Sequence, residues 1–212
     1  MENFSKKIEI SYINFISSHN RRPNQLSEFI DEELINEESI TYNSEKELNS
    51  LETSIWINSI ESAFHNASSD PNYLEYGARE KTLSFFYNLI EVLKSQKEFF
   101  VYSSNIHSPF ELKMVDDRST AIKNVFLSHF NTIITEAIET GEIESRMFIS
   151  DYYGNLIFAQ AVLVIKYWAN DTSEEAENTD EIIEKSVNLI MDLMAPNFAD
   201  SALSLVKFLF QK

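Results

Sequence analysis

The stretch MFISDYYGNLIFAQAVLVIKYWAN, residues 147–170, is the most apolar run in this sequence. An amphipathic surface helix has one apolar stripe, whereas this segment is apolar on nearly all sides, which predicts a helix that is buried on most of them. A membrane span needs about 20 apolar residues in a row, and Gln160 and Lys166 interrupt this one. The helix is therefore expected either inside the core of the chain or half against a second copy of it. We favour the second copy.

The composition of the whole chain favours a helical protein. Glycine and proline number only three and four in 212 residues, and sheet proteins need many turns built from these residues. No cysteine is present, which excludes disulfides and thiolate chemistry and fits a reducing cytoplasm. The beginning, MENFSKKIEI, lacks the apolar core of a signal peptide, so a cytoplasmic location is expected. The formal net charge of −17 makes the chain repel phosphate backbones.

Apolar residues recur at intervals of three and four along the whole chain, and this spacing predicts an all-α fold without strands. Gly141 follows one of the predicted helices, where a left-handed cap is wanted. A segment at 97–103 either extends the helix before it or forms a short helix of its own. The main predicted helices cover residues 2–19, 26–30, 36–43, 44–64, 73–96, 119–140, 151–169, 180–194 and 198–210.

Three segments carry a family resemblance: LSEFIDEELINEESITYNSEKELNSLETSIW (26–56), AREKTLSFFYNLIEVLKSQKEFF (78–100) and DYYGNLIFAQAVLVIKYWANDTSEEAENTDEIIEKSVNLIMDLM (151–194). In order and pattern they resemble the TetR family of bacterial transcriptional regulators. The resemblance implies a small helix-turn-helix head over residues 1–48 and a larger helical domain over 49–212. That domain would bind a ligand and form a homodimer through Asp151–Ala169 and Asp180–Met194.

The same resemblance implies two sets of site residues. DNA contacts would come from the third segment and the start of the next helix, with candidates Ser39, Thr41, Tyr42, Asn43 and Lys46. The alternative is that these are ordinary surface residues. A mostly apolar ligand cavity would be lined by Phe86, Tyr87, Phe126, His129, Phe130 and Tyr153. The alternative is that these aromatic side chains simply fill the core.

The head departs from the family pattern in its turn and in its charge. The family has a glycine between the two helices of its helix-turn-helix, whereas Leu34 or Ile35 stands here and the first glycine is Gly77. Residues 1–62 hold five basic and twelve acidic residues, a net charge of −7. Because nonspecific affinity for DNA comes from phosphate contacts, DNA binding is expected to be weak or absent. The alternative function is a dimer of this fold that binds a lipid-like molecule or a protein partner.

Catalytic and metal-binding motifs are not found. The four histidines are isolated from one another, and neither HxxxH nor HExxH occurs, so no metal site is expected. A Gly-rich phosphate loop and a GxSxG elbow are absent as well. The sequence therefore predicts a binding protein without a cofactor, and not an enzyme.

Overall fold

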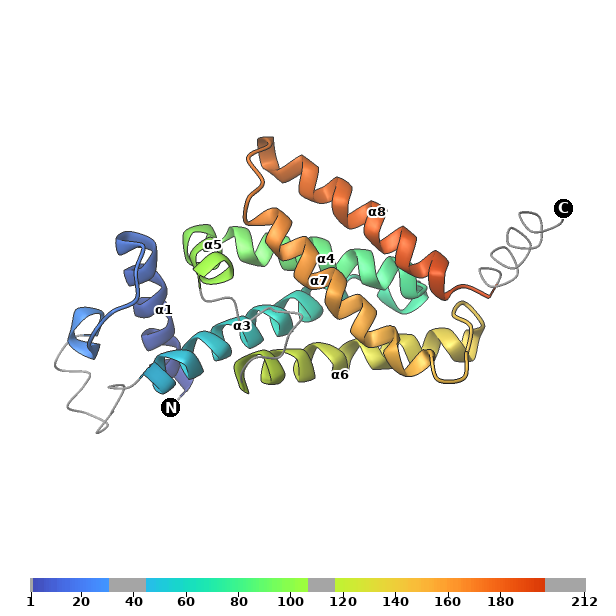
Figure 1. Ribbon diagram of the computed structural model, residues 1–212, viewed down its shortest axis with the longest axis horizontal. Coiled ribbons are helices and arrows are strands. Elements are labelled where there is room, and N and C mark those ends of the chain that lie inside the picture. Colours follow the sequence, from blue (N-terminus) through green and yellow to red (C-terminus); the bar gives the residue numbers. More distant parts are fainter. Residues whose placement is uncertain (1, 31–44, 107–116, 197–212) are drawn as a thin grey trace, which may run out of the picture.

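The computed structural model describes residues 2–30, 45–106 and 117–196, and every regular element in these ranges is helical, which confirms the all-α prediction (Figure 1). No helix in the described ranges has the length and apolar character needed to cross a bilayer. The helices predicted at 36–43 and 198–210 lie outside the described residues. The elements are α1 (Glu2–His19), η1 (Leu26–Glu28), α3 (Glu45–Ser68), η2 (Tyr73–Glu75), α4 (Ala78–Lys94), α5 (Lys97–Ile106), α6 (Asp117–Thr140), η3 (Ser150–Tyr152), α7 (Tyr153–Trp168), η4 (Glu174–Ala176) and α8 (Glu177–Met194).

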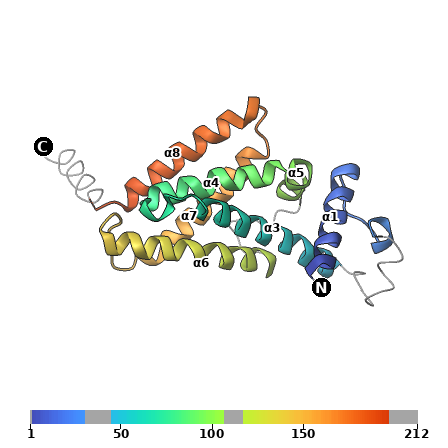
Figure 2. The same cartoon turned by 180° about the vertical axis from the view of Figure 1, so that it is seen from behind.

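The longer helices pack into one body, with α1 standing at one end of it. Helix α3 contacts α4 and α6, α7 contacts α6 and α8, and α8 also covers α4. Helix α1 contacts α5, and both views place it at the end of the molecule opposite the C-terminal end of α8 (Figures 1 and 2). The core is built from apolar side chains of all these helices.

Helix α3 connects the two parts of the molecule without a break. It runs from Glu45 to Ser68 and crosses the predicted domain boundary between residues 48 and 49. Its first half bonds to α1, because Tyr12 donates a hydrogen bond to Glu52. Its second half enters the core of the body, where Phe64 stacks on Phe85 of α4. One continuous helix therefore contacts both α1 and the core of the body.

The helix predicted over 73–96 begins later, because a distant carboxylate caps it. Glu142 accepts hydrogen bonds from the backbone N–H groups of Ala78 and Arg79, at 2.7 and 3.2 Å, and a carboxylate at a helix N-terminus is favourable. A Cβ on Gly77 would lie 2.8 Å from that carboxylate, so glycine permits its close approach. Gly141 has a φ of +78° and turns the chain after α6, as its sequence position predicts.

Asp171 holds the turn that folds α8 back onto α7. Its carboxylate accepts bonds from the backbone N–H and hydroxyl of Thr179, at 2.9 and 2.6 Å, and of Ser173, at 2.9 and 2.7 Å. Burial favours a higher pKa, but the bonds from Thr179 and Ser173 outweigh it and lower the pKa of Asp171 to about 2. The ionised carboxylate therefore fixes the start of α8.

Candidate functional site

Three of the six predicted ligand residues meet in one buried aromatic cluster. The side chains of Phe86, Phe126 and Phe130 are fully buried. The ring centroids of Phe126 and Phe130 lie 4.5 Å apart, and Phe85 lies 5.1 Å from Phe130. Phe64 stacks on Phe85 at 4.1 Å. These rings come from α3, α4 and α6, and they pack against one another between the three helices.

Of the other three predicted ligand residues, His129 stacks on Phe64 of this cluster, with 4.2 Å between the ring centroids, whereas Tyr87 and Tyr153 have other neighbours. Tyr87 is 37% exposed, and its pKa is raised by partial burial and by Asp180 and Glu184. His129 is half-buried, with Nε2 2.9 Å from a carboxylate oxygen of Glu61. Tyr153 is buried and donates a hydrogen bond to the backbone oxygen of Glu144 at 3.0 Å. The role of the six residues in ligand binding stays a prediction.

A surface groove of about 490 Å³ lies away from that aromatic cluster, between the start of α4 and the end of α6. Its volume is in the range of small-molecule sites. Apolar side chains of Leu74, Ile133 and Ala137 line it together with the carboxylates of Glu136 and Glu142. Glu142 already caps α4, so part of this negative charge is used within the fold.

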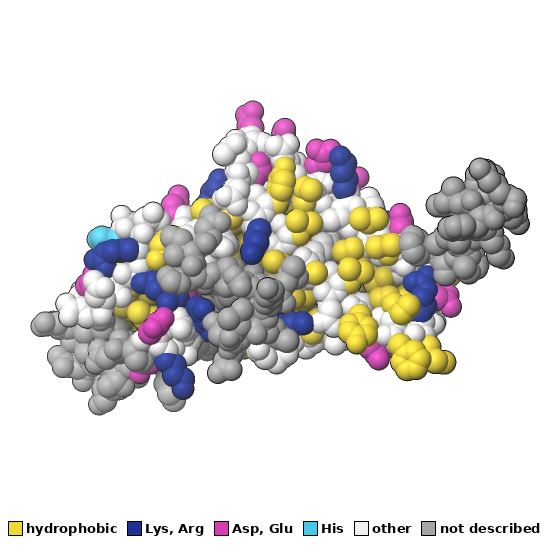
Figure 3. Space-filling view, viewed as in Figure 1, with side chains coloured by type: hydrophobic (Ala, Val, Ile, Leu, Met, Phe, Trp, Pro, Cys, Tyr) yellow, Lys and Arg dark blue, Asp and Glu magenta, His cyan; other side chains and the backbone are white. Residues whose placement is uncertain are grey.

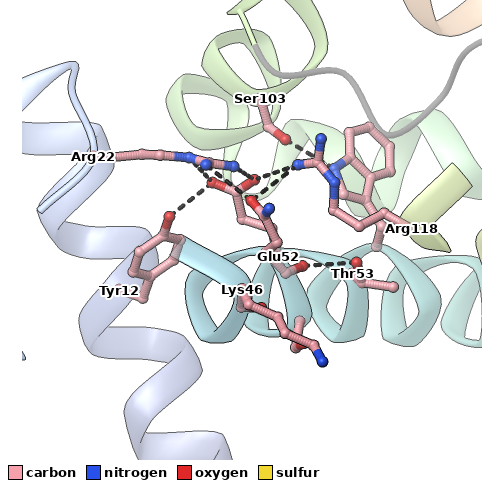
Figure 4. Close-up of polar contacts among 10 residues, drawn as sticks. Tyr12, Arg22, Lys46, Glu52, Thr53, Ser103 and Arg118 are labelled. Carbon is pink, nitrogen blue, oxygen red and sulfur yellow. Dashed lines mark hydrogen bonds and ion pairs between the residues drawn. The ribbon is translucent and has the colours of Figure 1, made fainter. Parts of the chain in front are cut away.

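A buried ionic cluster joins α1 to the body, and Glu52 is its centre (Figure 4). The Glu52 side chain is fully buried. It accepts a hydrogen bond from Tyr12 at 2.7 Å and a two-pronged bond from Arg22, whose Nε lies at 2.9 Å. Arg118, at the start of α6, lies 3.8 Å from the same carboxylate. We call these four residues the joint cluster.

The joint cluster brings together four segments that are far apart in sequence. Tyr12 belongs to α1, Arg22 to the segment after it, Glu52 to α3 and Arg118 to α6. Asn49 adds a second link, because its side-chain oxygen accepts bonds from Arg22 at 2.9 Å and from Arg118 at 3.2 Å. Removing one partner of such a buried ion pair is costly, because the other partner is left as an uncompensated buried charge. The cluster therefore fixes where α1 stands relative to α3 and α6.

Burial and the charge of Glu52 also shift ionisation within the cluster. Burial raises the pKa of Tyr12 far above its usual value, and the neighbouring Glu52 carboxylate adds to the effect. Burial acts to lower the pKa of Arg22, but its bond to Glu52 and the charge of Glu52 outweigh this and raise it. Tyr12 is thus held as a neutral donor and Arg22 as a cation.

The basic residues of the head are partly engaged within the fold. Arg22 is bound to Glu52, and Arg21 pairs with Glu28 at 2.5 Å. The side chains of Lys6, Lys7 and Lys46 are exposed, and Figure 4 shows Lys46 directed away from the joint cluster. Of the predicted DNA-contacting residues, only Lys46 is described. The others lie outside the described residues: Ser39, Thr41, Tyr42 and Asn43.

The outer face of α7 and α8 exposes apolar side chains. Leu163 on α7 is 52% exposed and Leu189 on α8 is 61% exposed, and Figure 3 shows hydrophobic side chains gathered over these two helices. Ala161 and Val162, the neighbours of Leu163, are buried inside the protomer. Large apolar patches on a protein surface mark interaction sites. The other exposed or half-buried apolar residues of this face are Tyr152, Leu156, Ala159, Tyr167, Ile182 and Leu193.

Comparison with known families identifies the architecture. The family model described as tetracyclin repressor-like, C-terminal domain, matches residues 81–209. This match covers more than half of the chain, which therefore belongs to the TetR-like proteins. Proteins of this family are regulators and are generally not enzymes. Comparisons with curated proteins and with solved structures gave no significant match.

The joint cluster was not predicted from the sequence. Glu52 stands among polar residues of a helix whose apolar spacing is regular, so it resembles an ordinary surface residue in the sequence. Its partners lie 40, 30 and 66 positions away, and no local spacing relates them. A weak signal exists in Arg22, which follows directly after α1 and would be costly to bury without a partner.

Proposed function

We propose that the protein is a homodimeric, ligand-responsive regulator of the TetR type, with a head over residues 1–48 and a ligand-binding and dimerising domain over 49–212. The observation that carries this proposal is the apolar outer face of α7 and α8, in a chain whose family match spans both helices. Covering this face with a second copy would give a four-helix bundle made from Asp151–Ala169 and Asp180–Met194. We expect a total buried area of about 2,000 Å² or more.

The ligand response would begin in the aromatic cluster and end at the head. A ligand among Phe86, Phe126 and Phe130 must part rings that pack against one another in the present state. Parting them moves α6 against α3 and α4, and Arg118 at the start of α6 is part of the joint cluster. The ligand would shift the equilibrium only by its difference in affinity between the packed and the parted states.

DNA binding by this head is expected to be weak. Three exposed lysines in each head, six in a dimer, would give a slope of log affinity against log salt of at most about 5 in magnitude. The pairing of Arg21 and Arg22 with carboxylates supports this expectation. The same observation favours a second candidate function, in which the dimer binds a lipid-like molecule or a protein partner and does not bind DNA.

Self-association is tested by changing Leu163 to Glu and measuring mass by sedimentation at micromolar concentration. The wild type should be a dimer, and Leu163→Glu should be a folded monomer, because a charge on the exposed face opposes burial against a second copy. The matched control is Leu74→Glu, since Leu74 is 92% exposed and lies outside this face. A folded wild-type monomer would contradict the proposal.

The choice between the two candidate functions needs a DNA titration. Fluorescence anisotropy with the protein's own upstream DNA, from low to physiological salt, should show weak binding with a shallow salt slope. Replacing Glu32, Glu33, Glu37 and Glu38 by Gln should raise nonspecific binding, because it removes negative charge from the head. Tight sequence-specific binding by the wild type at physiological salt would show that a few well-placed cations are sufficient.

A further inference from the structure

The loop between α6 and α7 carries four large apolar side chains that are exposed. Met147 is 81% exposed, Phe148 79%, Ile149 53% and Tyr152 67%. Single exposed apolar residues are ordinary on a protein surface. Four of them within residues 147–152 form a patch of the kind that marks an interaction site. We call these four residues the apolar tip.

The backbone at Phe148 is held in a conformation that a phenylalanine rarely adopts. Its φ is +65°, in the left-handed region, where the Cβ of a bulky residue crowds the backbone and costs free energy. Where the chain needs a positive φ after α6, it has a glycine, Gly141. A strained residue persists only because its surroundings hold it, and it is a reason to look for a function at that place.

Hydrogen bonds fix the apolar tip to the end of α8. Ser150 bonds twice to Arg146, because its hydroxyl accepts from the backbone N–H at 2.7 Å and donates to the backbone oxygen at 3.0 Å. The guanidinium of Arg146 donates to the backbone oxygens of Leu193 and Ala195, both at 2.8 Å. The tip is therefore preformed, and a preformed surface loses little conformational entropy when a partner covers it.

The apolar tip continues the outer face of α7 and α8. Tyr152 belongs to both, because it begins the row Tyr152, Leu156, Ala159 and Leu163, whose spacing of three and four residues places these side chains along one side of a helix. Figure 3 shows hydrophobic side chains over α7 and α8 and again beside the loop that precedes α7. A second copy that covers the outer face is therefore brought next to the tip.

A second copy fits this surface better than a lipid bilayer does. The formal net charge of −17 opposes approach to an anionic membrane, whereas an apolar patch next to a shared apolar face needs no charge. In a two-fold symmetric interface both copies supply the same patch. The tip lies at one end of the face, so the symmetry places one tip at each end of the interface.

We propose that the apolar tip of each copy packs against the partner copy and extends the homodimer interface beyond the four-helix bundle, with Phe148 as the anchor of this contact. The inference rests on the homodimer proposed above. In the isolated protomer Phe148 is both strained and exposed, so its side chain contributes little to stability. In the dimer the ring is removed from water, and buried aromatic anchors dominate the energetics of interfaces. The strain at Phe148 is thus offset only in the dimer.

Replacing Phe148 by Gly separates the protomer from the dimer, because the two respond differently. Glycine adopts a positive φ without a steric penalty, so Phe148→Gly should leave the urea midpoint of the monomeric Leu163→Glu variant equal or higher. In the otherwise wild-type chain it should raise the dissociation constant of the dimer by at least about tenfold, as expected on removing an interface anchor.

Two control variants accompany Phe148→Gly. Phe148→Met keeps a large apolar side chain and should retain most of the affinity of the wild-type dimer. Leu74→Gly also removes an exposed apolar side chain, but one that lies outside the outer face, in η2. It should leave the dissociation constant unchanged.

Chemical labelling measures directly whether the apolar tip is covered. The full chain contains no cysteine, so a single Met147→Cys reports on this loop alone. At protein concentrations well above the dissociation constant, a maleimide should react with it slowly in the dimer and rapidly in the Leu163→Glu monomer. Leu74→Cys is the matched control, since Leu74 is exposed to a similar degree, 92% against 81% for Met147, and it should react at the same rate in both.

The outcomes separate this inference from the homodimer on which it rests. A wild-type monomer contradicts the homodimer itself. A wild-type dimer whose affinity is unchanged by Phe148→Gly, or in which Met147→Cys reacts as fast as in the monomer, leaves self-association in place and overturns the role of the tip. A lower urea midpoint for Phe148→Gly in the monomeric variant overturns it as well, because the ring would then stabilise the protomer itself. If Phe148→Gly does not fold, the labelling of Met147→Cys still decides the matter.

Discussion

Replacing Glu52 by Ala should destabilise the protein more than almost any other single change of a charged residue. The substitution leaves the guanidinium groups of Arg22 and Arg118 near each other, with side chains only 14% and 19% exposed, and removes the acceptor of the Tyr12 hydroxyl. Breaking a buried ion pair from one side costs about 3–5 kcal/mol. A domain has only about 5–15 kcal/mol of stability in total, so Glu52→Ala should remove a large, measurable part of the free energy of unfolding.

Urea denaturation followed by tryptophan fluorescence measures this loss. Trp56 lies one helical turn after Glu52 and donates a hydrogen bond to Ser103 at 2.9 Å, so it reports on the region of the joint cluster. The background variant Trp168→Phe removes the only other tryptophan. Glu52→Gln keeps the shape of the side chain and one acceptor oxygen, and should lose less free energy of unfolding than Glu52→Ala.

A matched control comes from the same helix. Glu61 also contacts a residue distant in sequence, His129, but its side chain is 50% exposed. An exposed pair contributes about 0–1 kcal/mol, so Glu61→Ala should change stability little. If Glu52→Ala costs no more than Glu61→Ala, the joint cluster does not hold α1 to the body and the signalling path through it is refuted.

Two further predictions concern α7 and its turn. The pKa of Asp171 is about 2 in the fold, below the value of about 3.9 for an unfolded Asp. The stabilisation by Asp171 is therefore complete above about pH 3.9 and is lost as the pH falls through about 2. Asp171→Asn should therefore lower the melting temperature at pH 7 and reduce the dependence of stability on pH between 4 and 2; equal melting temperatures at pH 7 would contradict this. Ala161→Asp should unfold the protomer in circular dichroism, since Ala161 is fully buried within it, whereas Leu163→Asp should leave the helical signal intact; a folded Ala161→Asp monomer would show that Ala161 faces the partner.

The sequence alone was sufficient for the helical architecture and the family. Apolar spacing of three and four residues is a local property, and it located α1, α3, α6, α7 and α8 to within a few residues. The left-handed cap at Gly141 followed from the same local chemistry. The unusual apolarity of residues 156–165 correctly indicated a helix that is buried on most sides. The helix predicted over 73–96 begins only at Ala78. Its N-terminus is capped by Glu142, which is distant in sequence, so local spacing could not show where it begins.

Only the tertiary structure decided which side chains of these helices meet. Periodicity shows that α7 is apolar all round, but not that Ala161 points inward and Leu163 outward. Likewise it cannot show that Phe126 and Phe130 pack against each other, or that Glu52 is buried beneath two arginines. The physical reason is that helix formation depends on neighbours within about four residues, whereas these contacts join residues from separate helices. The geometry of these contacts is set by how whole helices pack, and it cannot be deduced from a local sequence pattern.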